Sequence, residues 1–382
     1  MNKFKFLLLL MILILIINKP AVADDSYQSM QVNCNGGAKN VSFVTIDLND
    51  PCINIESVFA GQQIGHTDYL QNIAEQLTDS NTEIVAAINA GFFNPVKDDS
   101  TQLWSTIQQK GTFVHLGSIG SAIGFGTDKN VAIENLYIVI KGSVDGKWDE
   151  PNGWSAWGLN HGYTQPEAVA VFTPSFGKTT GSHNRISIVV RNGRIIYTKN
   201  GEAPIYDDGY TIVMESNNKM LKRFRKGDAI TYKLAYYKSD YSQGLTLDGP
   251  INWDAFRVTV GAGPTLLKNG KIIANGRAEG FFESEMIDRS AVLRSFIGVN
   301  QKQQLFMGVA QMATVEETAE ICLNLGMTQA ICLDGGLSSS LYYRGKYVSG
   351  PFRKITDAIV ITRHKDIGLP GASQIKIKRF LI

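Results

Sequence analysis

The sequence has little cysteine and little histidine, which argues against a metal centre. Four cysteines and five histidines are spread over 382 residues, and no Cys-x-x-Cys pair occurs. Because zinc sites need several closely spaced Cys or His ligands, we expect no metal and no cofactor. In an oxidising compartment Cys34 and Cys52 are favoured to pair, because they close a local loop. Cys322 and Cys332 are expected either to bridge or to stay as buried thiols.

An excess of charge of either sign is also missing. Lys and Arg total 37 and Asp and Glu total 35, which gives a net charge of +2 with the charges scattered. This balance gives no basis for binding nucleic acid or an anionic membrane. Two enzyme motifs are absent as well. No G-x-G-x-x-G opens a helix, as dinucleotide binding requires, and no G-x-S-x-G marks a serine hydrolase.

Long apolar runs are confined to the N-terminus. Lys3 and Lys5 precede an unbroken apolar stretch at residues 6–17, and residues 21–23 read Ala-Val-Ala, a signal-peptidase site. That stretch is too short to span a bilayer, which takes about 20 residues. Residues 1–23 are therefore predicted to be a cleaved secretory signal. We expect an exported protein, periplasmic or secreted, without a stable membrane span after removal of the signal.

The rest of the chain is rich in glycine turns and in short β-branched runs, which predicts a turn-rich, sheet-rich protein. Residues 24–40 are polar and are expected to form a loosely held leader. The length beyond it allows one long domain or two lobes, and we expect residues 41–382 to form a single domain with hairpin insertions. A helix is predicted after Thr314, because Glu317 completes a capping box with it and Gly326 ends the pattern.

Two distant segments share one pattern, in which a helix and a buried strand lead to a polar residue and then to glycine. In the first segment the strand ends at Asn89, shortly before Gly91. In the second it ends at Asp334, followed by two glycines and by serines at 338–340. Two such strand ends can be neighbours in one sheet and line one cleft. The same residues also suit turn caps, and the pattern alone leaves both interpretations open.

The chemistry of the second segment suits a polar or anionic ligand. The N–H groups of Gly335 and Gly336 together with the serine hydroxyls can form an anion nest, and Asp334 can act as an acid, a base or a nucleophile. Arg294 can bind a phosphate through its planar fork, or form a structural ion pair with a nearby acid. Glu283 and Glu285 are candidates for the second carboxylate that a two-carboxylate glycosidase needs. Tryptophans 148, 154 and 157 can stack on sugars or pack under a loop.

Four stretches, in chain order, resemble motifs of the phosphodiester glycosidase family. They are Ile88–Phe93, Gly261–Pro264, Arg294–Val299 and Leu333–Ser339. The resemblance implies an α+β fold with a mixed, mostly antiparallel sheet and a few packed helices. It also implies hydrolysis of a sugar-1-phosphodiester at the glycosidic bond. The site residues that it implies are Asp334, Arg294 and Asn89 for catalysis and Gly91, Gly263, Gly335, Gly336, Ser338 and Ser339 for substrate binding.

The function that we predict from the sequence is therefore that of an exported hydrolase. Its substrate is expected to be a GlcNAc-1-phosphodiester-like group in envelope or extracellular glycans. Two alternatives remain. A non-catalytic glycan-binding protein on the same fold is one, because the chain departs from the family pattern at Leu337, which narrows the space beside the turn, and at Cys332. A metal-dependent phosphodiesterase that uses Asp334 with nearby acids is the other.

Overall fold

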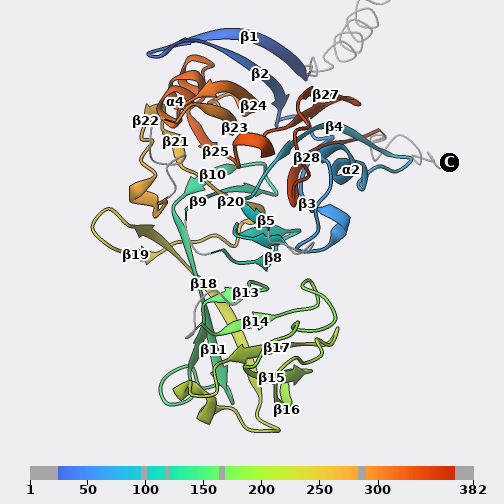
Figure 1. Ribbon diagram of the computed structural model, residues 1–382, viewed down its shortest axis with the longest axis vertical. Coiled ribbons are helices and arrows are strands. Elements are labelled where there is room, and N and C mark those ends of the chain that lie inside the picture. Colours follow the sequence, from blue (N-terminus) through green and yellow to red (C-terminus); the bar gives the residue numbers. More distant parts are fainter. Residues whose placement is uncertain (1–24, 96–100, 118–119, 163–167, 283–289, 366–382) are drawn as a thin grey trace, which may run out of the picture.

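The computed structural model describes residues 25–95, 101–117, 120–162, 168–282 and 290–365 (Figure 1). The predicted signal at residues 1–23 and the acids Glu283 and Glu285 lie outside this part of the chain. Antiparallel sheets dominate, and the described residues hold two α-helices, α2 (Leu70–Glu75) and α4 (Val315–Asn324). The predicted α+β class is therefore wrong, and the protein is mainly β. Neither described helix is long and apolar enough to cross a membrane.

The largest sheet has seven strands and carries α4 on one face. Its strands, in spatial order, are β1 (Ser26–Cys34), β2 (Gly37–Asp47), β24 (Gln304–Ala313), β23 (Val292–Val299), β25 (Gln329–Cys332), β21 (Thr265–Lys268) and β22 (Lys271–Ile272). The expectation of a loose leader at residues 24–40 is wrong for most of its length. Strand β1 pairs with β2 along all nine of its residues, because ladder hydrogen bonds can hold a polar strand at a sheet edge without burying its side chains.

A second sheet carries α2. Its order is β27 (Lys346–Ser349), β26 (Leu341–Tyr343), β4 (Thr82–Asn89), β28 (Asp357–His364) and β3 (Ile53–Phe59). A third sheet has the order β10 (Val131–Glu134), β9 (Ser121–Gly126), β20 (Phe256–Ala262), β7 (Ile107–Gln109) and β8 (Thr112–His115), with a small hairpin of β5 (Phe93–Pro95) and β6 (Thr101–Leu103). These three sheets share one core, to which each contributes buried aliphatic side chains such as Ile331, Ile359 and Ile123.

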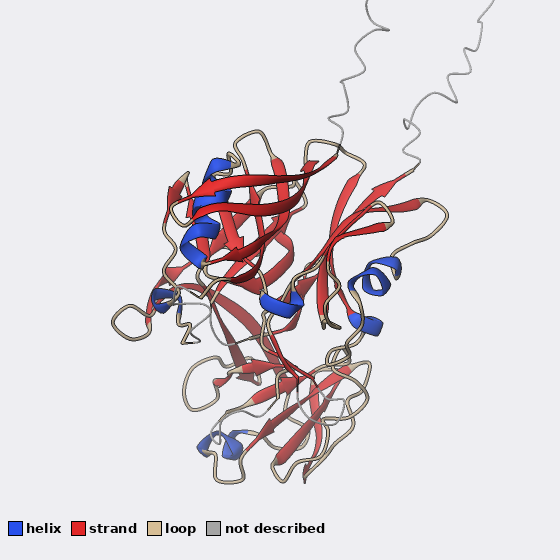
Figure 2. Ribbon diagram, turned by 45° about the horizontal axis from the view of Figure 1, so that its top comes forward, coloured by secondary structure: helices blue, strands red, loops and turns tan. Residues whose placement is uncertain are grey.

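Two further sheets form the lower part of the molecule in Figure 1, and the long strands β11 and β18 lead into them. One sheet has the order β12 (Trp154–Ala156), β11 (Leu136–Val144), β18 (Ile230–Asp240) and β19 (Thr246–Pro250). The other has the order β13 (Gly158–Leu159), β14 (Ala170–Phe172), β17 (Gly209–Met214), β15 (Ile186–Arg191) and β16 (Arg194–Asn200). They enclose a second core. Figure 2 shows how strands outnumber helices throughout.

The cysteine prediction is corrected by the strand geometry. All four cysteines are free thiols. Cys34 Sγ contacts the Gly37 carbonyl at the start of β2, whereas Cys52 lies beyond the far end of β2. An 11-residue strand is about 35 Å long, and a disulfide needs Cα atoms within about 7 Å. The favoured pairing of Cys34 with Cys52 is therefore wrong, while Cys322 and Cys332 are buried thiols in one core cluster.

The three tryptophans do not form one surface. Trp154 is buried and packs edge-on against Phe224 and Tyr232, with ring centroids 5.9 and 6.4 Å away. Trp148 is exposed beneath the Lys233 ammonium, and Trp157 meets the ring of a buried histidine. The structure therefore shows that Trp154 packs inside the protein and is not free to stack on a sugar.

The predicted capping box of α4 is confirmed. Thr314 Oγ1 accepts a bond from the Glu317 N–H at 3.1 Å, and the Glu317 carboxylate accepts one from the Thr314 N–H at 2.8 Å. Thr314→Ala is expected to lower the free energy of unfolding by about 1 kcal/mol, measured by urea titration. Thr198→Ala, at an exposed strand position, serves as the control and should change it by less than about 0.5 kcal/mol. Equal losses of unfolding free energy in the two variants would show that the cap does not stabilise the protein.

Candidate active site

Asn89 joins three segments at the point where two sheets meet. It ends β4, is 1% exposed, and its side-chain N–H donates to the Asp334 carbonyl at 2.6 Å. Its side-chain oxygen accepts from the Ser295 hydroxyl at 2.7 Å and from the Ser340 N–H at 3.0 Å. The Asp334 N–H in turn donates to the Ala90 carbonyl at 3.0 Å. The two strand ends are thus neighbours, which the sequence pattern left open, and they belong to different sheets.

The Asn89 amide binds groups inside the protein in all three of these contacts. The residue therefore holds the Asp334 turn in place. Asn89→Ala would leave a buried hydroxyl, an N–H and a carbonyl without their partner. We expect a loss of about 3 kcal/mol in the free energy of unfolding, measured by urea denaturation. Asn40→Ala, at an exposed position of β2, is the control. A loss as small as that of the control would show that the brace is not needed.

Asp334 follows β25 at the entrance to a short turn. Gly336 adopts a left-handed φ of 59° and begins a 3₁₀ turn at Gly336–Ser338. Gly335 lies so close to the Leu293 carbonyl that a Cβ would stand 3.0 Å from it, which explains a glycine there. The Asp334 side chain keeps 15% of its surface exposed, so a ligand can reach the carboxylate.

The cation that faces Asp334 is Arg353, which the sequence analysis missed. Its Nη2 lies 3.4 Å from Asp334 Oδ2, and its Nε donates to the Ser338 hydroxyl at 2.8 Å. The guanidinium lies over the Phe93 ring, 4.5 Å from the centroid, and its side chain is 34% exposed. The distance to Asp334 is long for a charge-assisted bond, whereas Nε and Nη2 both contact the Ser338 hydroxyl, so Ser338 is the closer partner of the guanidinium.

A second carboxylate, Asp357, lies behind the first and was also missed. It begins β28, is 1% exposed, and accepts from the Gly91 N–H at 3.1 Å and from the Thr356 hydroxyl at 2.8 Å. A Cβ at Gly91 would stand 2.7 Å from the Ser105 side chain and 3.1 Å from Asp357. Glycine at this predicted position therefore permits a close approach of the main chain to Asp357.

Burial raises the pKa of both carboxyl groups. The pKa of Asp334 is about 6, because burial and, to a smaller degree, the Asp357 charge raise it, while the Ser338 hydrogen bond and the Arg353 cation lower it. Burial likewise raises the pKa of Asp357 to about 6, against the hydrogen bonds from Thr356 and Gly91. Because Asp334 is the more exposed, it is the one that can meet substrate, and Asp357 is a positioning residue.

Two histidines support the segment beneath Gly91. His115 Nδ1 donates to the Ser105 carbonyl at 2.6 Å, and His161 Nδ1 lies 3.1 Å from His115 Nε2. Burial lowers the pKa of His115 to about 3 and that of His161 to about 4. Both rings are therefore neutral at physiological pH. The Ser105 hydroxyl accepts from the Phe92 N–H at 2.7 Å, which ties this pair to the glycine loop.

Arg294 has a buried position against the same turn. It is 2% exposed, and its guanidinium donates to the carbonyls of Ala313 at 3.1 Å and Ser290 at 2.9 Å. A Cβ on Gly335 would lie 3.9 Å from Arg294 Nη1, so the cation reaches the main chain of the turn. The guanidinium thus lies beside the turn, bound to carbonyls outside it, and the catalytic role predicted for Arg294 stays a prediction.

The remaining predicted positions have different surroundings. Gly263 has a φ of 144°, and a Cβ there would stand 2.6 Å from the Phe281 ring, so this glycine serves packing. Its N–H donates to the Cys332 carbonyl at 2.9 Å, which places it behind β25. The Ser339 hydroxyl is buried and has no partner among the described residues, as expected of a group that awaits water or ligand. Leu337 is 63% exposed and points to solvent.

No three Cys, His, Asp or Glu side chains are grouped to hold a metal in the part of the chain that the structure describes. The arrangement offers one partly exposed carboxylate, one partly exposed cation and a serine hydroxyl that contacts the cation. Such a set can hold an anion against Arg353 while Asp334 exchanges a proton or faces a developing cation.

Comparison with protein families gives a match over residues 176–362 to the phosphodiester glycosidase family. This range holds three of the four motif stretches, together with Arg353 and Asp357, whereas Asn89 lies before it. The resemblance stated from the sequence is confirmed. No curated protein matches the chain.

Two solved structures with TM-scores above 0.6 share the fold, and a third is less similar. A hypothetical protein from Synechocystis is 24% identical with a TM-score of 0.76, over 89% of this chain and 62% of its own. A protein from Burkholderia pseudomallei K96243 is 16% identical with a TM-score of 0.64, over 85% of this chain and 74% of its own. The catalytic domain of zebrafish N-acetylglucosamine-1-phosphodiester α-N-acetylglucosaminidase is 11% identical with a TM-score of 0.48, over 91% of this chain and 85% of its own. This chain thus spans under two thirds of the Synechocystis protein.

Proposed function

We propose that the protein is a hydrolase that cleaves the glycosidic bond of a sugar-1-phosphodiester, with a GlcNAc-1-phosphodiester as the first candidate. One observation carries the proposal. The segment that matches the phosphodiester glycosidase family contains Asp334, Ser338 and Arg353, and the structure brings these three side chains together. A carboxylate beside an arginine suits a substrate in which an anomeric carbon is bonded to an anionic phosphate.

In this proposal Arg353 turns from Asp334 to the phosphodiester and balances the charge that builds up as the phosphate leaves. A phosphomonoester is a good leaving group, so the reaction needs little protonation of it. The Asp334 carboxylate then stabilises the cationic anomeric centre or takes the proton from the attacking water. The C1–O bond to phosphate breaks and a C1–O bond to water forms, which yields free sugar and a phosphomonoester.

The test is turnover of a GlcNAc-1-phospho-p-nitrophenyl diester, with products separated by chromatography. Cleavage at the glycosidic bond gives GlcNAc and p-nitrophenyl phosphate. Cleavage at phosphorus gives p-nitrophenol and GlcNAc-1-phosphate. If EDTA abolished that cleavage, the protein would be the metal-dependent phosphodiesterase instead. Binding of phosphoglycans without either product would establish the glycan-binding alternative and overturn the proposal.

Export to the periplasm or medium is part of the proposal and rests on residues 1–23. The apolar stretch at 6–17 and the Ala-Val-Ala at 21–23 support it. N-terminal sequencing of the protein recovered from the producing cells tests it. A mature chain that begins at Asp24 is expected, and an intact Met1 in the cytoplasmic fraction would contradict it.

A further inference from the structure

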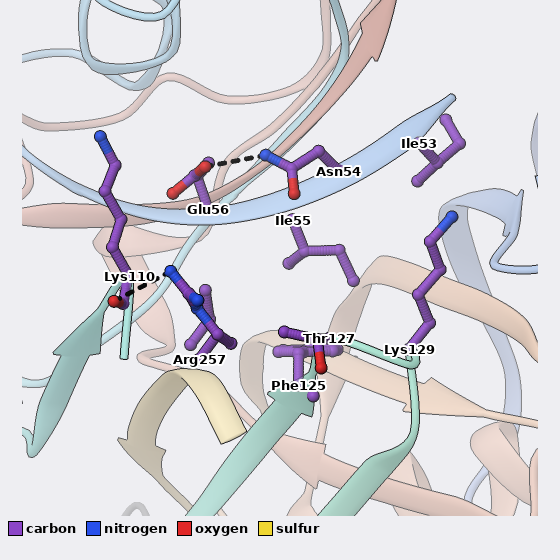
Figure 3. Close-up of a pocket in the computed structure, with 11 residues that line it drawn as sticks. Ile53, Asn54, Ile55, Glu56, Lys110, Phe125, Thr127, Lys129 and Arg257 are labelled. Carbon is purple, nitrogen blue, oxygen red and sulfur yellow. Dashed lines mark hydrogen bonds between the residues drawn. The ribbon is translucent and has the colours of Figure 1, made fainter. Parts of the chain in front are cut away.

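A cavity of about 240 Å³ lies away from the Asp334 turn, where β3 meets the strands of the third sheet (Figure 3). Strand β3 is the last strand of its own sheet, and the opposite wall is formed by β9, β20 and the turns that follow β7 and β9. Its lining includes Asn54, Glu56, Lys110, Lys129 and Arg257.

The charges around this cavity are unbalanced. Three cationic side chains line it against one carboxylate, that of Glu56, which leaves an excess of two positive charges. Asp50 and Asp47 also act on the Lys129 ammonium, but neither lines the cavity, and the Asp50 carboxylate forms an ion pair of 2.9 Å with Arg363. In Figure 3 Lys110 and Arg257 lie on one side of the cavity and Lys129 on the other. A concave surface lined by an excess of one charge favours a ligand of the opposite sign.

Two of the three cations are held by main-chain carbonyls. Arg257 occupies a bulge in the pairing of β20 with β9, and its Nη2 donates to the Lys110 carbonyl at 3.1 Å. Lys110 has a left-handed φ of 49° in the turn between β7 and β8. Lys129 has a left-handed φ of 61°, and its ammonium donates to the Asp50 carbonyl. A bulge re-aims a side chain and is common near functional sites, so Arg257 and Lys129 are positioned before any ligand arrives.

The edge strand β3 also directs main-chain groups toward the cavity. In its antiparallel pairing with β28, Ile55 stands opposite Ile361, and the N–H and C=O groups of alternate residues point away from the partner strand. The Cys52 carbonyl accepts from the His364 N–H, which assigns the outward-pointing set to Ile53, Ile55 and Ser57. The N–H of Ile55 is thereby directed to the cavity side, as a neutral donor beside the cations.

We propose that this cavity is a binding site for a phosphate group, either free phosphate or the phosphate of a sugar phosphate, distinct from the site at Asp334. Its volume lies below the roughly 300–1,000 Å³ typical of pockets for whole drug-sized ligands, so it suits one charged group with little attached. The inference does not depend on the proposed hydrolase function, because none of the lining residues belongs to the Asp334 turn.

The test is calorimetric titration of the full chain with inorganic phosphate and, separately, with glucose 1-phosphate at low salt. Arg257→Gln and the exposed Lys110→Gln are each expected to weaken phosphate binding about tenfold, because a charge-assisted hydrogen bond is lost. Arg225→Gln, at an exposed position in the lower part of the molecule, and Arg353→Gln in the Asp334 site are expected to retain the affinity of the unmodified chain for this site. Tighter binding of glucose 1-phosphate than of phosphate would identify a sugar phosphate as the source.

Three outcomes overturn the proposal. They are the absence of phosphate binding by the unmodified chain, equal affinities in the Arg257→Gln and Arg225→Gln variants, and loss of all binding in Arg353→Gln alone. Circular dichroism and thermal unfolding confirm that each variant is folded. If Arg257→Gln fails to fold, Lys110→Gln still decides the question, because its side chain is exposed.

Discussion

Asp334→Asn is expected to lower kcat/KM for the GlcNAc-1-phosphodiester by about 10³-fold, the middle of the range for loss of a proton-transfer group. The amide keeps the shape of the side chain but can neither accept the proton of the attacking water nor balance a cationic anomeric carbon. The measurement is the initial rate of p-nitrophenyl phosphate release under substrate concentrations well below KM.

Two controls accompany this variant. Asp128→Asn replaces an exposed carboxylate in a turn of the third sheet and should leave the rate unchanged. Thermal unfolding of Asp334→Asn should show a folded protein, since the Asn89 amide binds the Asp334 main-chain carbonyl and not its carboxylate. Equal rates for Asp334→Asn and the unmodified chain would remove Asp334 from the mechanism.

The centre of the site was predictable because it depends on local patterns. Asn89 and Asp334 each end a short apolar strand before glycine, and such strand ends tend to converge where sheets meet. Their direct hydrogen bond favours convergence over separate turn caps, although the two strands lie in different sheets. The capping box of α4 was predictable for the same reason, since Thr314 and Glu317 are three residues apart and interact within one turn.

The partners of Asp334 were not predictable, because their positions depend on tertiary contacts. Arg353 lies in an irregular segment between β27 and β28 and has no pattern that separates it from the other basic residues of the chain. Asp357 gave one weak signal, since it is a carboxylate directly before an apolar strand, as Asp334 is a carboxylate directly after one. A search for acids on both sides of buried strands would have found it.

The predicted helix content was too high. The resemblance supplied the α+β expectation, whereas the short β-branched runs had already indicated a sheet-rich protein. The β1 strand was overlooked because its sequence is polar at most positions, and an edge strand is held by main-chain bonds that leave no apolar alternation. The Cys34–Cys52 pairing failed because closeness in sequence was taken for closeness in space, although a full strand separates the two.

Arg353→Gln is expected to lower kcat/KM by about 10²-fold, because a donor aimed at the developing phosphate charge is removed. It should also move the acidic limb of the pH–rate profile. The Arg353 cation favours the charged form of Asp334 and so lowers its pKa, against the burial that raises it to about 6. Removing the cation raises that pKa. A mechanism that needs the Asp334 carboxylate then loses activity at a higher pH than the unmodified chain does.

Arg353→Lys separates charge from shape in this prediction. Lysine keeps the cation that lowers the pKa of Asp334 but cannot contact Asp334 and Ser338 with one planar fork. Its acidic limb should therefore stay near that of the unmodified chain while its rate falls. If Arg353→Gln and Arg353→Lys showed the same limb, Arg353 would act only through geometry. If Asp334 reacted as the protonated acid instead, its titration would set the alkaline limb, and the higher pKa in Arg353→Gln would move that limb to higher pH.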